Sequence, residues 1–181
     1  DQKKRRYRDA FGLSAYDARH LIEHRATADF FEAAMVCAND VSLAKPLANL
    51  VINDVTARMN ADADFDLAWS PLTPQRACDL VKLLAADDIS SKQGKEVFAA
   101  IIDEDADPAA IVEARGMRQV SDTAAIEAVI DQVIAENADA VERYRAGNAK
   151  LIGFFVGQCM KAMRGQGNPK VINRILAQKL K

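Results

Sequence analysis

The hydrophobic positions along the chain recur every three or four residues over most of its length. This spacing is clearest in five segments, which begin at Ser14, Ser42, Thr73, Ser90 and Asp122. A recurrence of this kind places the apolar side chains on one face of an amphipathic helix. We find no convincing alternation of apolar and polar residues with hairpin turns, which would indicate strands. The pattern therefore predicts an all-α protein.

Short polar residues mark where several of these helices should begin. Ser14 with Asp17 resembles a capping box, in which side chains and backbone N–H groups bond reciprocally at a helix start. Proline is tolerated only in the first turn of a helix, which favours a start shortly before Pro46. Further starts are expected at Thr73-Pro74, Ser90 or Ser91, Asp107-Pro108, Ser121-Asp122 and Asn168-Pro169.

Interruptions of the pattern divide the chain into parts. We expect a break near Arg25 to Thr27 and a polar loop from Asp62 to Pro74. Gly116 is typical of a residue that ends a helix, and a fresh cap follows a few residues later. We therefore expect two helical domains, residues 1–117 and 118–181.

Composition agrees with a helical protein of the reducing cytoplasm. Half of the residues are hydrophobic but only 6% are aromatic, and Ala and Leu enter helices at little cost. No apolar run approaches the roughly 18 residues of a membrane helix, and no signal peptide is visible. The three cysteines lie far apart and are expected to be free thiols, as in a cytoplasmic protein. The chain does not begin with Met, so we expect a fragment of a longer protein.

The charges are unevenly distributed. Residues 1–8 carry +4, and residues 143–181 carry +9 because they contain nine basic residues and no acid. The whole chain carries −2, so residues 9–142 carry −15. A basic end on an otherwise acidic chain favours a polyanionic partner for that end. The alternative is an inert surface with an uneven charge.

The segment HLIEH matches the short His-x-x-Glu-His pattern of one group of zinc peptidases. Spacing of four would place His20 and His24 on one helical face, with Glu23 as a possible base. The chain has no other His, and a third ligand would have to be a carboxylate. We therefore interpret the segment as ordinary helix surface and expect no metal site.

The segment GFFVG contains Gly153 and Gly157, four residues apart. Small residues at this spacing allow two helices to approach closely. Each glycine costs about 1 kcal/mol relative to Ala in a helix interior, so a packing reason is expected. We predict that these glycines lie in a helix–helix contact; a direct role in function is the alternative.

The segment RGQGNP joins two predicted helices, the first of which should run from about Asn148 to Arg164. Gly165 and Gly167 permit positive φ and close approach of the backbone. The start of the next helix, with basic residues around it, would form a phosphate cradle. A tight helix–helix turn is the alternative. The candidate nucleic-acid-binding residues are Lys161, Arg164, Gly165, Gly167, Asn168, Lys170 and Arg174.

No arrangement of residues in the sequence indicates catalysis. We find no Ser-His-Asp arrangement, no nucleotide-binding glycine loop and no carboxylate pair in distinct environments. We therefore assign no catalytic residues and no cofactor to this chain.

Several segments, in order, resemble the C-terminal half of GatB, the B subunit of the tRNA-dependent amidotransferase. The likeness begins at FGLSAYDA, residues 11–18, and continues through ADFFEAAM, ISSKQGKEVF and DPAAIVEARGMRQVSD. It ends in VGQCMKAMRGQGNPKVINRIL. Some positions depart from the family pattern: Phe11 replaces a Tyr, Asn49-Leu50 replaces an Asn-Trp pair, Gln166 replaces a Lys and Gly167 replaces an Ala.

The resemblance implies a helical domain followed by a small YqeY-type tail domain that binds the body of tRNA. It also implies a parent enzyme, a ligase, that amidates Glu-tRNA(Gln) and Asp-tRNA(Asn) with ATP and Mg2+, together with GatA and GatC. The catalytic cradle domain of that enzyme is not in this chain, which would be non-catalytic and would position the tRNA. The alternative is an all-helical protein–protein interaction module with a basic docking tail.

Overall fold

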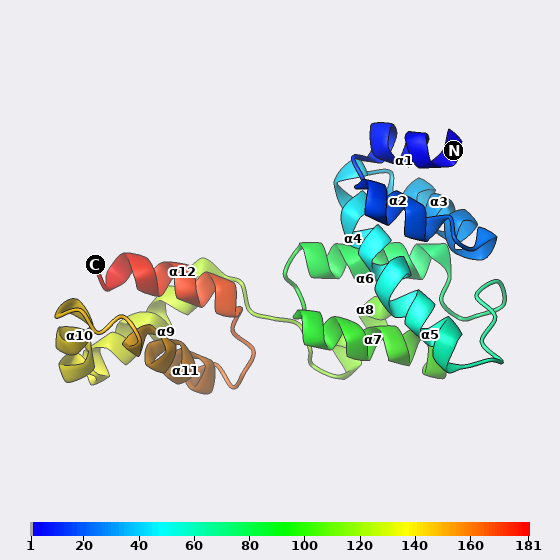
Figure 1. Ribbon diagram of the computed structural model, residues 1–181. Helices are drawn as coiled ribbons and strands as arrows, with labels where there is room; N and C mark the ends of the chain where they lie inside the picture. Colours follow the sequence, from blue (N-terminus) through cyan, green and yellow to red (C-terminus); the bar gives the residue numbers. More distant parts are fainter. Residues whose placement is uncertain (1) are drawn as a thin grey trace. The chain divides into compact units, whose positions relative to one another are not determined.

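Every regular element that the structure describes, over residues 2–181, is a helix, which confirms the all-α prediction. Figure 1 shows the computed structural model. The chain forms two compact units, unit 1 (Asp1–Gly116) and unit 2 (Met117–Lys181). No helix within residues 2–181 has both the length and the apolar character needed to cross a membrane.

Unit 1 is a cluster of helices around α6 (Pro74–Ala85). The other elements of unit 1 are α1 (Gln2–Phe11), α2 (Ala15–Leu21), α3 (Arg25–Ala38), η1 (Val41–Leu43), α4 (Ala44–Asn49), η2 (Leu50–Val55), α5 (Thr56–Ala61), α7 (Ser91–Glu104) and α8 (Pro108–Ala114). The buried face of α6, with Leu80 and Val81, contacts α3, α4, α7 and α8. This face therefore forms the centre of the core.

The break between α2 and α3 lies at residues 22–24, not at Arg25 to Thr27 as predicted. Helix α3 already begins at Arg25, and Thr27 lies in its first turn. The Thr27 hydroxyl donates to the carbonyl oxygens of Leu21, at 2.9 Å, and of His24, at 2.8 Å. Thr27 thus stabilises the corner between the two helices, because its hydroxyl bonds to Leu21, the last residue of α2, and to His24, the residue before α3.

Residues 44–61 form one continuous helical segment, of which the central part is a π-helix. Pro46 is the third residue of α4, so its missing N–H falls in the first turn, as expected. The sequence pattern did not predict the π-helical part, Leu50–Val55. At its end the Val51 carbonyl oxygen accepts from the Thr56 N–H, five residues on, and also from the Thr56 hydroxyl at 3.0 Å.

Asp17 connects α2 to α4 through a buried carboxylate. The predicted capping box is present, with Asp17 N–H donating to the Ser14 hydroxyl oxygen at 3.0 Å. The Lys45 ammonium donates to both carboxylate oxygens at 2.8 Å, while Asp17 is only 3% exposed. Burial raises the pKa of Asp17, but the hydrogen bonds from Lys45 and Ser14 outweigh it, so this pKa is lowered overall.

Replacing Asp17 with Ala should lower the free energy of unfolding of unit 1 by about 2 kcal/mol, because a helix cap and a charged hydrogen bond are lost together. A lowered pKa means that the carboxylate stabilises the fold at neutral pH and loses this effect as the pH falls through it. The difference between wild type and variant should therefore shrink in acid.

Hydrogen exchange of α3 and α6 amides, measured at neutral and acidic pH, reports the stability of unit 1 alone. Asp9→Ala is the control, because the ion pair that Asp9 forms with Arg5, at 3.8 Å, is exposed to solvent. Equal exchange rates for the Asp17 variant and the control would contradict the prediction.

Unit 2 is a four-helix unit within the described residues, with a core of its own. Its elements are α9 (Thr123–Glu136), α10 (Ala138–Arg145), α11 (Leu151–Ala162) and α12 (Pro169–Lys179). Ile126, Ile130, Phe155 and Ile172 are fully buried at the centre of this core. The predicted apolar stripe from Ile126 to Ile134 contributes its α9 side.

The predicted start of α11 at about Asn148 is three residues early. Residues 148–150 form tighter turns, in which the N–H groups of Leu151, Ile152 and Gly153 donate to carbonyl oxygens three residues earlier, at 3.2–3.3 Å. The α-helix begins only at Leu151. The approach to α11 is therefore a tight turn rather than a capped helix start.

Candidate nucleic-acid interface

The turn between α11 and α12 brings the predicted binding residues together. Two successive residues, Arg164 (φ 54°) and Gly165 (φ 75°), have left-handed backbones, and the Gly165 N–H donates to the Met160 carbonyl oxygen at 2.8 Å. Positive φ was expected at Gly165 but not at Arg164, where it costs an L-residue about 1–2 kcal/mol. The turn is therefore closed tightly behind α11.

Gly167 and Asn168 are buried, and they attach this turn to the segment that precedes α9. Asn168 N–H donates to the Val120 carbonyl oxygen at 2.9 Å, and Val120 pairs with Gly167 in a parallel bridge. The Asn168 side chain donates to the Ser121 hydroxyl oxygen at 3.1 Å and caps α12 by accepting from Lys170 N–H at 3.0 Å.

Gly167 lacks the positive φ that the sequence pattern allowed for it. Glycine suits this position because there is little room for a side chain: a Cβ atom would lie 2.8 Å from both Ile172 Cδ1 and Met163 Sδ. A methyl group at this position would therefore displace the Met163 thioether and the Ile172 side chain, and Ile172 is fully buried. The two buried candidates, Gly167 and Asn168, thus shape the turn from within.

The basic candidates are exposed on both sides of the turn. Lys161 lies in the last turn of α11 and Arg164 follows it, while Lys170 and Arg174 lie four residues apart on α12. Within residues 2–181, Lys161, Arg164 and Arg174 form no ion pair with an acid. Their charges therefore remain available to an anionic partner.

Lys179, which is basic but not a candidate, behaves differently. Its ammonium lies 2.7 Å from the Asp131 carboxylate and 4.0 Å from that of Glu127, both on α9. The hydrogen bond to Asp131 raises the pKa of Lys179. The sequence after Glu142 contains no acid, but the fold brings acids of α9 to one of its cations.

The HLIEH segment does not place its two histidines on one helical face. Helix α2 ends at Leu21, and His24 lies at the start of α3 in extended conformation. His20 is instead 3.2 Å from the Glu23 carboxylate, and its ring contacts the Tyr16 ring. No group of three or more His, Cys, Asp or Glu residues that could hold a metal occurs among residues 2–181.

The predicted helix–helix packing of Gly153 and Gly157 is wrong. Both glycines are exposed on α11, and no heavy atom of a neighbouring element lies within 4 Å of a Cβ placed at either position. Their place on α11 therefore has no explanation in the packing of unit 2.

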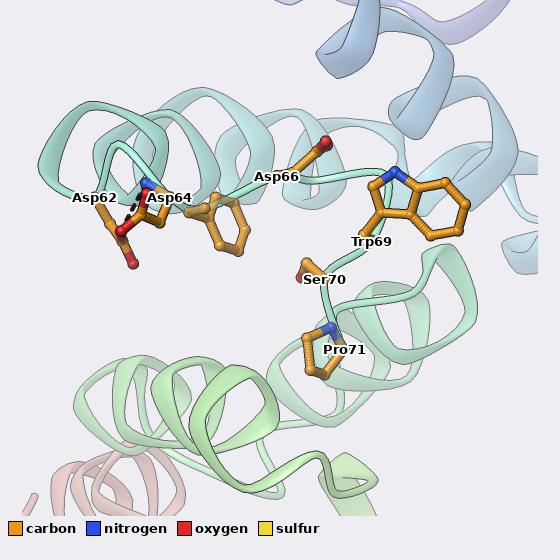
Figure 2. Close-up of a pocket in the computed structure, with 7 residues that line it drawn as sticks. Asp62, Asp64, Asp66, Trp69, Ser70 and Pro71 are labelled. Atoms are coloured by element: carbon orange, nitrogen blue, oxygen red, sulfur yellow. Dashed lines mark hydrogen bonds between the residues drawn. The ribbon is translucent and has the colours of Figure 1, made fainter.

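A shallow pocket in unit 1 is formed by the loop that follows α5. Figure 2 shows its lining, which includes the side chains of Asp62, Asp64, Asp66 and Trp69. The pocket encloses about 250 Å³, and no basic residue lines it. Trp69 is 88% exposed. Three carboxylates line the pocket, and the nearby Arg58 is already paired with one of them, Asp62, at 3.4 Å. A lining of this charge does not suit a phosphate, so the pocket does not fit a nucleotide.

Comparison with known protein families matches residues 29–180 to the GatB domain. This range covers most of both units and includes every candidate residue of the turn. The chain belongs to the GatB family. The region corresponds to the C-terminal, YqeY-like part of the family's amidotransferase component, as the resemblance of its motifs indicated.

Close relatives of this GatB chain are named as the B subunit of aspartyl/glutamyl-tRNA(Asn/Gln) amidotransferase. The protein of Picosynechococcus is 43% identical over 180 residues, and that of Dinoroseobacter shibae is 47% identical over 180 residues. The match covers 99% of this chain in both cases, but only 36% and 35% of the relatives. The chain thus spans little more than a third of the relatives' length.

Asn168→Ala should destabilise unit 2 by about 2 kcal/mol, since it removes the cap of α12 and the bond to Ser121. Hydrogen exchange of α11 and α12 amides measures this loss. Asn173→Ala is the matched control, because Asn173 is exposed on α12. Unchanged protection in the Asn168 variant would show that the turn does not depend on this side chain.

Proposed function

We propose that this chain is the tRNA-binding part of the B subunit of a tRNA-dependent amidotransferase. Unit 2 would bind the body of the tRNA, and the exposed cations around the α11–α12 turn would contact its phosphates. The parent enzyme would amidate Glu-tRNA(Gln) or Asp-tRNA(Asn) in a complex with GatA and GatC. Membership of the GatB family and the names of the relatives support this assignment.

The observation that carries the proposal is a set of exposed cations around one hydrogen-bonded turn. Lys161, Arg164 and Arg174 are exposed and form no ion pair within residues 2–181, and Lys170 is exposed beside them. Main-chain bonds to Val120 hold the turn in place. Cations that are already positioned bind a phosphate backbone with little loss of conformational freedom.

The distribution of charge between the two units supports the same assignment. Residues 117–181 contain ten basic and six acidic residues and carry +4, so the remaining residues, 1–116, carry −6. An acidic unit repels a nucleic-acid backbone, and a basic unit attracts it. The charge pattern thus favours contact of RNA with unit 2 over contact with unit 1.

We also propose that this chain performs no chemistry of its own. The parent enzyme's ATP and Mg2+ would be bound outside it, in the cradle domain that the family resemblance implies. The acidic pocket of unit 1 does not fit a triphosphate, because no cation lines it. The chain's own residues would therefore bind and orient the tRNA.

Replacing both Lys161 and Arg164 with Ala should weaken binding of a tRNA(Gln) transcript and of a non-cognate tRNA by similar factors, because phosphate contacts position without specifying sequence. For the wild type, about four phosphate contacts predict a slope of log K against log salt of roughly −3 to −4. The double variant should have a slope shallower by about 1 to 2.

The matched control is the pair Lys92→Ala and Lys95→Ala, which removes the same charge from exposed positions of α7 in unit 1. Filter binding over a range of salt concentrations should give the wild-type slope for this control. Equal losses in the two double variants would indicate a diffuse charge effect. A wild-type chain that binds no tRNA, but does bind an acidic component of the complex, would favour the protein-docking alternative.

A further inference from the structure

Trp69, the only tryptophan of the chain, lies on the surface of unit 1 although its loop is anchored on both sides. Trp69 is 88% exposed, whereas Leu67 and Leu72 are buried. The Leu72 N–H also donates to the Ser70 hydroxyl oxygen at 2.9 Å. The loop therefore holds a large apolar ring in water, and exposed rings of this kind are the side chains on which protein interfaces most often depend.

The loop contains two successive turns of the same construction, each with an aspartate followed three residues later by an aromatic residue. In the first turn the Phe65 N–H donates to the Asp62 carbonyl oxygen at 3.1 Å. In the second turn the Trp69 N–H donates to the Asp66 carbonyl oxygen, also at 3.1 Å. The two turns therefore carry a carboxylate and an aromatic ring at matching positions, and all four side chains line the pocket (Figure 2).

The first turn binds a guanidinium of the chain itself. The guanidinium carbon of Arg58, on α5, lies over the Phe65 ring, 5.6 Å from its centre. Nη2 of the same side chain is 3.4 Å from the Asp62 carboxylate. The ring face and the carboxylate thus hold one guanidinium together, through cation–π attraction and an ion pair. A planar, weakly hydrated guanidinium suits this combination better than an ammonium does.

The second turn presents the same two groups to solvent. Within residues 2–181, Asp66 forms no ion pair and no cation lies over the Trp69 ring. Asp66 is exposed, and its side chain accepts only the Ala68 N–H, at 2.9 Å, in that part of the chain. The carboxylate and the indole are therefore accessible to a cation from outside the chain. An indole is the aromatic group that attracts cations most strongly.

The charge of unit 1 determines which partner suits this turn. Residues 1–116 carry −6, and three carboxylates line the pocket beside Trp69. Negative charge repels a phosphate backbone and attracts a basic segment of a protein. A divalent metal needs several oxygen ligands, and no group of three acids that could hold one occurs among residues 2–181. The charge and the exposed ring together favour a basic protein.

We propose that Asp66 and Trp69 form a docking site for an arginine side chain on a basic segment of another protein. The guanidinium stacks on the indole and pairs with the Asp66 carboxylate, as that of Arg58 does with the ring and carboxylate of the preceding turn. The inference goes beyond the proposed function and does not rest on it, because it concerns residues of unit 1 alone.

The single tryptophan makes this site directly observable, because the indole N–H of Trp69 gives one cross-peak in a nitrogen–proton NMR spectrum of the whole chain. Adding an acetylated and amidated Arg-Arg-Arg peptide should shift this cross-peak saturably. A Lys-Lys-Lys peptide of equal charge should bind more weakly, because an ammonium stacks less well on the ring. No saturable shift with the arginine peptide, or equal affinities for the two peptides, would overturn the proposal.

Two substitutions test the two groups separately, with affinity measured by fluorescence anisotropy of a labelled Arg-Arg-Arg peptide. Asp66→Asn removes the charge but keeps an oxygen that can accept from the Ala68 N–H. It should weaken binding by about threefold, the size of an exposed ion pair. Trp69→Leu should also weaken binding by about threefold, as the loss of a cation–π contact does. Neither change should lower thermal stability, because both side chains are exposed.

Glu96→Gln is the matched control, because it removes one negative charge from an exposed position of α7 that does not line the pocket. It should keep wild-type affinity for the arginine peptide. Equal losses in Glu96→Gln and Asp66→Asn would indicate diffuse charge attraction and overturn the docking site.

Three further outcomes separate the proposed partner from other occupants. A shift of the indole cross-peak with CaCl2 alone, abolished by Asp66→Asn, would identify a metal site instead. A mass that rises with protein concentration in light scattering, and no longer does so in Trp69→Leu, would identify a second copy of this chain as the occupant. Loss of arginine-peptide binding in both variants, at unchanged tRNA affinity, supports a protein-docking site that is independent of RNA binding.

Discussion

The attachment of the α11–α12 turn to Val120 is the interaction on which unit 2 depends. Asn168 contributes a backbone bond to Val120, a side-chain bond to Ser121 and the cap of α12, and it is almost completely buried while doing so. One residue thus orients a helix start and anchors the turn to the segment before α9. The positions of the cations on both sides of the turn follow from this attachment.

The same turn explains why a left-handed arginine is tolerated in unit 2. Arg164 would avoid positive φ in an isolated chain. In the fold, its N–H donates to the Lys161 carbonyl oxygen and the Gly165 N–H donates to that of Met160, and these two hydrogen bonds hold the left-handed backbone. The strain is small compared with the burial of Ile172 and Phe155, which the turn makes possible. An exposed cation is thereby held on a backbone that does not move freely, which favours its use in binding.

Local chemistry made the helix starts predictable from the sequence. Ser14, Thr73 and Asn168 cap helices at the predicted positions, because a capping side chain bonds only to N–H groups two or three residues away. The turn that gathers the candidate cations is also local, so the sequence could place them near one another. The burial of Gly167 was not predicted, because it depends on contact with Val120, 47 residues earlier.

The errors share one physical origin, which is that sequence spacing does not reveal what lies opposite a residue. Thr27 was interpreted as part of a break although it stabilises the first turn of α3. Gly153 and Gly157 were assigned to a helix contact because small residues at that spacing often pack. Only the fold shows that nothing faces them. A local pattern thus predicts reliably what is decided within one helical turn, such as a cap, and fails where the outcome depends on which other element lies opposite the residue.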